Sequence, residues 1–170
     1  MQEVVSEIIA WAWARHHNEW SWYIRPVLLL PFCWFAWRRS LAGIMLSLVA
    51  LVTSMAWFPA PEVPSPMALE LLAAEKAYLL APWSFGKVAM ALLIPFSFAA
   101  LALAFWHRSP GWGLVVINTM VLAKILWTVV VFTPEGALYH LVPAFLGVAV
   151  CNVVLIGAWA MIRRARRRGG

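Results

Sequence analysis

A single lysine, Lys124, lies inside a long apolar stretch, residues 112–132, that contains no other charged residue. It is nine residues from Thr133, a distance of about 14 Å along a helix. The ammonium group is therefore expected near the middle of a bilayer, where inserting a lysine costs roughly 2.5–3.5 kcal/mol. Because residues at this depth commonly face a cavity or a partner, Lys124 indicates a site for an anionic group or a proton. The alternative is a lysine that snorkels or packs against backbone carbonyls.

Four other polar residues extend this predicted site into a path for a solute. Thr128 lies one helical turn from Lys124 on the same face, whereas Asn118 lies about 120° around the helix. Glu135 and Glu75 lie outside the apolar stretches and are expected at the mouth of the path. The alternative for Asn118 is an interhelical hydrogen bond, which is the commoner role of asparagine within a span.

Three histidines are candidates for binding a metal or transferring protons. His16 and His17 precede the first apolar stretch, and His140 follows Glu135 by five residues. Imidazole and carboxylate groups bind zinc or copper and also act as acids and bases. However, adjacent histidines on a helix point about 100° apart, and no two histidines show the His-x-x-x-His spacing. The sequence therefore predicts no metal site, and it identifies no cofactor.

The composition shows the medium in which these residues lie. Of 170 residues, 64% are hydrophobic and 12% are charged, which is about half the charged share of a soluble domain. The apolar residues form long runs without two-residue alternation, so the sequence predicts an all-α polytopic membrane protein and excludes a barrel. Five arginines crowd residues 163–170. Beside a span, such a tail indicates the cytoplasmic side and anionic lipid rather than nucleic acid.

Four segments approach or exceed the roughly 20 residues that a helix needs to cross a bilayer. A fifth segment contains Arg25, which is expected to snorkel toward the interface beside Trp20, Trp22 and Tyr23. The alternative is four spans, with residues 1–37 on the membrane surface. The sequence thus predicts a single membrane domain with an interfacial helix at 1–19, about five spans at 20–37, 41–58, 83–106, 112–132 and 141–162, and a basic tail at 163–170.

A second interfacial helix is predicted between the second and third spans. Met67, Leu71 and Tyr78 recur there at helical spacing, after a proline-rich stretch that cannot form a helix. Arg39 and Arg108 each follow a predicted span on the same side as the basic tail. The positive-inside rule makes that side cytoplasmic, so the N-terminus is predicted outside and the C-terminus inside. Ten arginines against three lysines suggest a bacterial inner membrane.

The chain also contains two similar halves. Residues 7–22, EIIAWAWARHHNEWSW, and residues 70–85, ELLAAEKAYLLAPWSF, begin and end alike. Later in each half, residues 38–40 read Arg-Arg-Ser and residues 107–109 read His-Arg-Ser. This order of features predicts a duplicated unit, a flat helix followed by a transmembrane hairpin, with both copies facing the same way. The alternative is chance, because apolar sequences draw on few residue types.

Three classes of function remain open from the sequence. The first is a carrier or binding component for a small or amphiphilic solute, with the path through Lys124. The second is an accessory subunit of a larger membrane complex, which fits a chain without a sizeable domain outside the membrane. The third is an enzyme acting on a lipid or isoprenoid at the outer face, with His16, His17, His140 and Glu135 as its chemical groups. The expected partners are the lipid bilayer and a second membrane protein or another copy of the chain.

Overall fold

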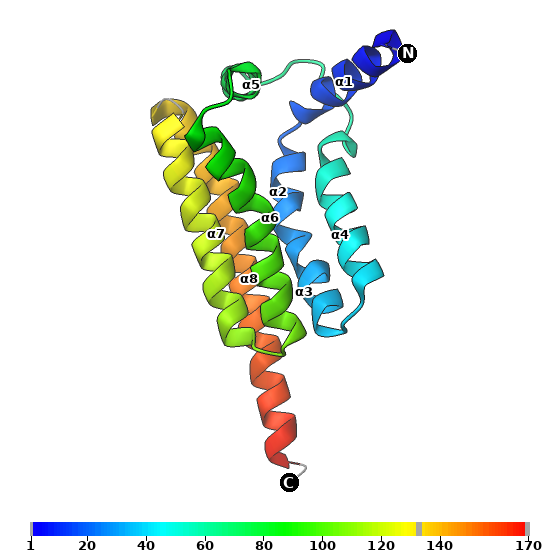
Figure 1. Ribbon diagram of the computed structural model, residues 1–170, viewed down its shortest axis with the longest axis vertical. Helices are drawn as coiled ribbons and strands as arrows, with labels where there is room; N and C mark the ends of the chain where they lie inside the picture. Colours follow the sequence, from blue (N-terminus) through cyan, green and yellow to red (C-terminus); the bar gives the residue numbers. More distant parts are fainter. Residues whose placement is uncertain (1, 132–133, 169–170) are drawn as a thin grey trace.

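The computed structural model describes the backbone of residues 2–131 and 134–168, and their side chains except those of 131–140, 165 and 166. All regular structure in this part of the chain is helical, which confirms the predicted all-α fold. In chain order the elements are α1 (Gln2–His16), α2 (Trp20–Val27), α3 (Leu29–Trp37), α4 (Leu41–Thr53), the 3-10 helix η1 (Ser54–Ala56), α5 (Pro66–Leu80), α6 (Phe85–Trp106), α7 (Pro110–Val131) and α8 (Pro134–Arg168) (Figure 1).

Among the described residues, three helices are long and apolar enough to cross a membrane: α6, α7 and the part of α8 from Leu141 to Arg164. These helices support a multi-pass membrane protein. α4 and η1 together form a shorter apolar helix, Leu41–Ala56. α2 and α3 have only 8 and 9 residues, so neither is long enough alone. Helix length therefore does not establish the predicted count of five spans.

The interruption between α2 and α3 has a local cause. The two helices follow one another along the bundle and are separated only by Leu28 (Figure 1). Pro26 and Pro31 lie on either side of this residue. A proline donates no backbone hydrogen bond, and its ring crowds the carbonyl four residues earlier, so two prolines within six residues weaken the helix there. Residues 20–37, predicted as one span, consequently form two short helices in line.

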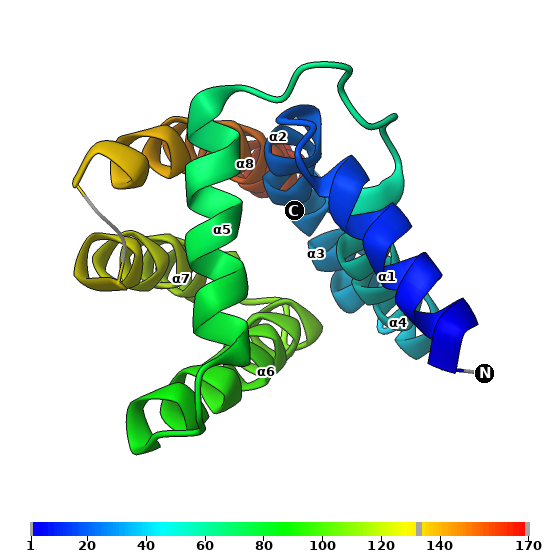
Figure 2. The ribbon, with the colours of Figure 1, turned by 90° about the horizontal axis from the view of Figure 1, so that it is seen from above.

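The helices form a bundle with two further helices lying across one end. α3 contacts α4 and α6, α2 contacts α8, and α7 contacts both α6 and α8. Seen from above, α5 crosses the end of this bundle, and α1 lies at the same end (Figure 2). The main core is apolar and joins α3, α4, α6, α7 and α8 through Phe32, Cys33, Ala36, Ile44, Leu101, Phe105, Ile117 and Cys151.

The turns of the two hairpins have the same backbone geometry. Arg39 and Arg108 both adopt positive φ angles, 56° and 57°. In the first turn, the N–H groups of Arg39 and Ser40 donate to the carbonyls of Ala36 and Phe35. Arg108 and Ser109 donate to Phe105 and Ala104 in the same pattern. This is the Schellman arrangement of a helix C-terminus, and both turns lie at the end of the bundle opposite α1 and α5 (Figure 1).

A glycine allows α8 to approach α2 closely. A Cβ atom on Gly147 would lie 2.1 Å from Cβ and 2.4 Å from Cγ of Pro26. One turn further along α8, the buried Cys151 Sγ donates to the carbonyl of Pro26 at 3.3 Å. The Gly147 contact therefore fixes the position of α2, and Arg25 lies on α2 directly before Pro26.

Candidate functional site

A small apolar cluster attaches α5 to the end of the bundle. Trp22 of α2 is buried together with Ala68, Leu71 and Leu72 of α5, and Trp13 of α1 packs against them. The indole N–H of Trp22 donates to the His16 carbonyl at 3.2 Å. Trp22 was expected at the membrane interface, but it is only 6% exposed. Trp22 therefore holds α1, α2 and α5 together, and these three helices position the charged residues that are described next.

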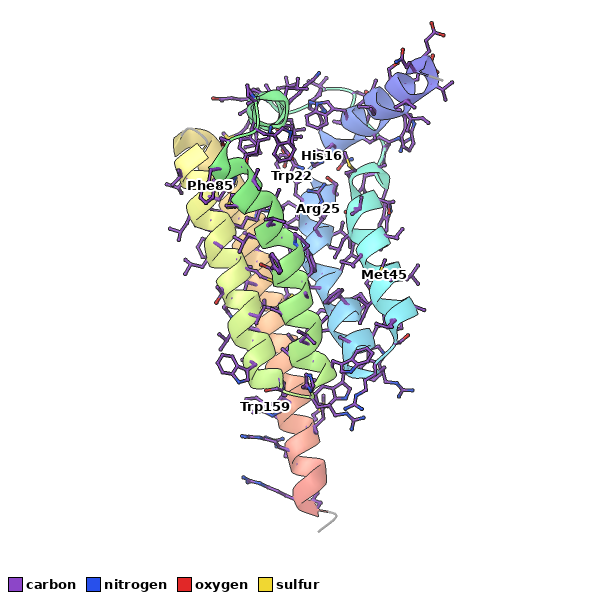
Figure 3. All side chains as sticks on the ribbon, viewed as in Figure 1. His16, Trp22, Arg25, Met45, Phe85 and Trp159 are labelled. Carbon is purple, nitrogen blue, oxygen red and sulfur yellow. The ribbon has the colours of Figure 1, made fainter. Side chains whose placement is uncertain are left out.

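His16 lies at the centre of a charged group and is 4% exposed. Its Nδ1 is 3.3 Å from Nη2 of Arg25, which lies just beneath it in Figure 3. Its Nε2 is 3.7 Å from Oε2 of Glu75. Arginine can only donate hydrogen bonds, so Nδ1 must accept. The proton of the neutral ring therefore resides on Nε2, directed toward the carboxylate. The 3.7 Å separation is long for a hydrogen bond but short enough for electrostatic attraction.

Arg25 connects this group to a fourth element. Its Nε donates to Oγ of Ser54 in η1 at 3.4 Å, and that hydroxyl donates to the Leu51 carbonyl at 2.7 Å. Ser54 is fully buried. Side chains from α1, α2, α5 and η1 thus form one polar chain within the apolar end of the bundle. On α2, the buried Oγ of Ser21 has no hydrogen-bond partner in the part of the chain that the structure describes.

Lys124, on α7, lies near the same group, within the range of charge interaction with Arg25 and Glu75. The side chain of Lys124 is exposed. Thr128, one turn along α7, is 3% exposed and donates to the Lys124 carbonyl at 2.8 Å. We call Arg25, His16, Glu75 and Lys124 the charged cluster.

An aromatic contact links the charged cluster to the start of α6. Trp127, three residues after Lys124, makes an edge-to-face contact with Tyr78 of α5 at 5.5 Å between ring centroids. The ammonium of Lys87 lies 5.4 Å from the Tyr78 ring. Lys87 is buried, and it donates at 2.8 and 2.6 Å to two carbonyls at the C-terminal end of α5. Lys87 therefore stabilises the end of α5 rather than joining the cluster.

The other residues predicted to form the site lie elsewhere or outside the described side chains. Asn118 and Asn152 exchange two amide hydrogen bonds, 3.0 and 3.1 Å long, between α7 and α8. Asn118 also donates to the Leu114 carbonyl, so its amide is engaged in helix pairing. Glu135 and His140 belong to the backbone of α8, and their side chains lie outside the described residues. The roles of these residues in a solute path stay predictions.

The histidines are not brought together in the described part of the chain. His17 Nδ1 donates to the Trp13 carbonyl at 2.9 Å, whereas His16 contacts Arg25 and Glu75. No group of three or more histidine, cysteine or acidic side chains within metal-binding reach occurs among the described residues. The arrangement at His16 suits electrostatic binding and proton positioning better than metal coordination.

The sequence marks Lys124, Thr128, Glu75 and His16 as candidate residues, but no pattern in it associates them with Arg25, which is expected to snorkel at the end of a span. One available signal was its depth: it is five residues into α2, and Lys124 is seven residues before the end of α7, so both lie roughly 10 Å below the same end of the bundle. Two basic residues at one depth in an apolar bundle are a signal that their side chains lie near each other.

The chain matches no protein-family model, and it has no significant match among curated proteins or solved structures.

Proposed function

We propose that this membrane protein binds a small or amphiphilic solute through an anionic group held between Arg25 and Lys124. The observation that carries the proposal is the charge of the cluster. Arg25 is cationic, Glu75 supplies one negative charge, and Lys124 and His16 are bases that can each take up a proton beside them. With Lys124 protonated and His16 neutral, the cluster has one positive charge in excess, counted among the described residues. An excess charge near apolar surroundings is unfavourable, and a bound anion would neutralise it.

The surroundings of the cluster favour a ligand with an apolar portion. α6 begins beside Tyr78, which also contacts Trp127 above Lys124. From Phe85 to Phe96, every residue of α6 except Lys87 and Met90 is exposed, and most of them are apolar. An alkyl chain bound along this part of α6 would keep its head group near Lys124. The predicted solute is therefore an anionic amphiphile, such as a compound with a carboxylate or phosphate head.

We infer five spans, with α2 and α3 together making the first and α4 with η1 the second. The support is the position of α2 and α3 beside α4 and α6 along the bundle (Figure 1). Arginines gather at the end with the hairpin turns, whereas α1 and α5 lie at the other end. By the positive-inside rule the turns and the C-terminus are cytoplasmic and the N-terminus is outside. The arginine-rich composition favours a bacterial inner membrane.

We also infer that the chain arose from a duplicated unit of one flat helix and one hairpin. The strongest support is the pair of matching turns, in which Arg39 and Arg108 have the same conformation and the same hydrogen-bond pattern. Each hairpin also follows a helix at the opposite end of the bundle, α1 in one half and α5 in the other (Figure 2). The interface between two such halves is a common place for a solute site, and Arg25 and Lys124 belong to different halves.

A binding assay tests the proposed function directly. The purified protein in mild detergent is titrated with dansyl-undecanoate, and energy transfer from tryptophan to the dansyl group reports binding. Lys124→Leu should weaken binding roughly 10- to 100-fold, because a charge-assisted hydrogen bond contributes about 1.5–3 kcal/mol. Lys76→Leu is the matched control, since Lys76 is an exposed lysine of α5 outside the cluster, and it should change binding less than twofold. Equal binding by all three proteins, or equal binding of the uncharged methyl ester, would refute the proposal.

The alternative role as an accessory subunit has one observation in its favour. The exposed first half of α6 would also suit a helix of a larger partner. Co-purification of a stoichiometric partner in mild detergent, combined with unchanged dansyl-undecanoate binding in Lys124→Leu, would favour this role over solute binding.

A further inference from the structure

An open hollow lies at the end of the bundle opposite the charged cluster. It has a volume of about 570 Å³ and is formed by the turn between α6 and α7 together with α8. Trp159 of α8 lies at the level of this turn (Figure 3). We call this open pocket the turn hollow, and its lining includes His107, Arg108, Ser109, Gly111, Trp112 and Trp159.

The charge around the turn hollow has one sign. Arg108 lines it, and Arg163 stacks on Trp159 with its guanidinium carbon 4.2 Å from the ring centroid. Arg39 reaches the same region and donates to the Trp106 carbonyl at 3.3 Å. None of the described residues that line the hollow is acidic. The guanidinium groups are therefore stabilised by aromatic rings and carbonyls rather than by carboxylates, and they remain able to bind an anion.

Neutral groups in the turn hollow fit a phosphate in particular. Ser109 contributes a hydroxyl, and α7 begins at the next residue, Pro110. The first N–H groups of a helix have no acceptor within it, and they favour a bound anion. Gly111 lines the hollow at the second position of α7, and a Cβ atom there would meet nothing within 4 Å. The hydroxyl, the helix end and Arg108 thus surround space that is open to a head group.

We propose that the turn hollow binds the phosphate head group of an anionic phospholipid. A membrane lipid is favoured over a soluble phosphate because the phosphate-binding groups adjoin exposed apolar surface. Trp112 is 68% exposed, and Val115, one turn further along α7, is 53% exposed. Tryptophan rings prefer the level of the lipid head groups, so the acyl chains would extend along α7 from a phosphate held at Arg108. This site is at the other end of the molecule from the charged cluster and does not depend on the proposed function.

Native mass spectrometry of the detergent-solubilised protein tests this site. Phosphatidylglycerol and phosphatidylcholine with identical acyl chains are compared, and phosphatidylglycerol should bind more tightly. Arg108→Asn should weaken phosphatidylglycerol binding about fivefold; asparagine is chosen because it tolerates the positive φ of this position. Arg167→Asn, on the part of α8 beyond the turn hollow, is the control for charge and should have less than a twofold effect.

A second variant, which leaves Arg108 in place, tests the lipid site even if Arg108→Asn is unstable. Gly111→Leu retains Arg108 but places a bulky side chain in the hollow beside it, and leucine is the better helix former. It should weaken phosphatidylglycerol binding at least fivefold, whereas Gly157→Leu, at an equally open position of α8, should not. Equal binding of the two lipids, or equal effects of each variant and its control, would overturn the proposal. Displacement of the lipid by millimolar inorganic phosphate would identify a soluble anion instead and would overturn the assignment to a lipid.

Discussion

The close approach of α2 and α8 at Gly147 makes a quantitative prediction. Replacing Gly147 by alanine places a methyl group 2.1 Å from one ring carbon of Pro26 and 2.4 Å from the next, where ordinary contact begins near 3.4 Å. A proline ring cannot rotate away, so the two helices must separate by about 1 Å. Overpacking of this kind costs about 1–3 kcal/mol. Alanine also stabilises a helix by about 1 kcal/mol relative to glycine, and this gain offsets part of the steric cost.

Gly157→Ala provides the correction for this gain. Gly157 lies on the same helix, and a Cβ atom there meets nothing within 4 Å. Both variants gain the same helix propensity, so the difference between them isolates the steric cost of about 1–3 kcal/mol. For a chain of this length the difference corresponds to roughly 2–12 °C in Tm. Gly157→Ala should raise Tm, and the Tm of Gly147→Ala should be roughly 2–12 °C lower than that of Gly157→Ala.

The protein contains a suitable reporter for this measurement. Cys33 and Cys151 are free thiols, and both are buried. A dye that becomes fluorescent on reaction with thiols will report their exposure as the detergent-solubilised protein is heated. Cys151 is one turn from Gly147 and donates to Pro26, so the dye should react with Gly147→Ala at a lower temperature. Identical melting curves for the two alanine variants would show that α2 and α8 do not meet at this glycine.

Two further predictions concern polar contacts. Replacing either asparagine of the Asn118–Asn152 pair by leucine should destabilise the protein, and the double variant with leucine at both positions should recover part of the loss. The coupling energy from this double-mutant cycle should be about 0.6–1.7 kcal/mol. A coupling energy of zero would exclude a direct hydrogen-bonded pair. Lys87→Met should cost about 1.5–3 kcal/mol, because it removes the hydrogen bonds from the ammonium to the carbonyls of Leu79 and Ala81. Limited proteolysis should then cut near the end of α5 faster than in wild type, and an unchanged cleavage rate would contradict this role of Lys87.

The sequence predicts the long helices well because each is encoded locally. The spans expected at 83–106 and 112–132 correspond to α6 (Phe85–Trp106) and α7 (Pro110–Val131). Their apolar runs are continuous, and backbone groups in a bilayer must pair within their own helix. The single span expected at 20–37 is interrupted, although its two prolines were visible in the sequence. An apolar run shows that a segment is buried in lipid, but it does not show whether its helix is continuous.

The charged cluster was harder to predict because its members are distant in sequence. The sequence predicts Glu75 at the mouth of the path and His16 at the surface; in the structure His16 lies against Arg25 and Glu75 lies against His16, beside the cluster of Trp22 with α5. This arrangement depends on packing between α1, α2 and α5, which no local pattern encodes. The prediction that Asn118 belongs to a solute path remains open, since its amide pairs with Asn152. Its alternative, an interhelical contact, follows from the tendency of isolated asparagines to pair within membranes.

The positive φ angles of Arg39 and Arg108 have a consequence for biogenesis. A side chain in the left-handed region costs roughly 1–2 kcal/mol, which glycine would avoid. Glycine at both positions should therefore stabilise the two hairpin turns, but it would remove the arginine side chain from each turn. During membrane insertion, those two cations would oppose translocation of the turns across the bilayer in the orientation inferred above. Each turn is thus less stable with arginine than its backbone would allow with glycine, and in the inferred orientation the same two charges would favour correct insertion.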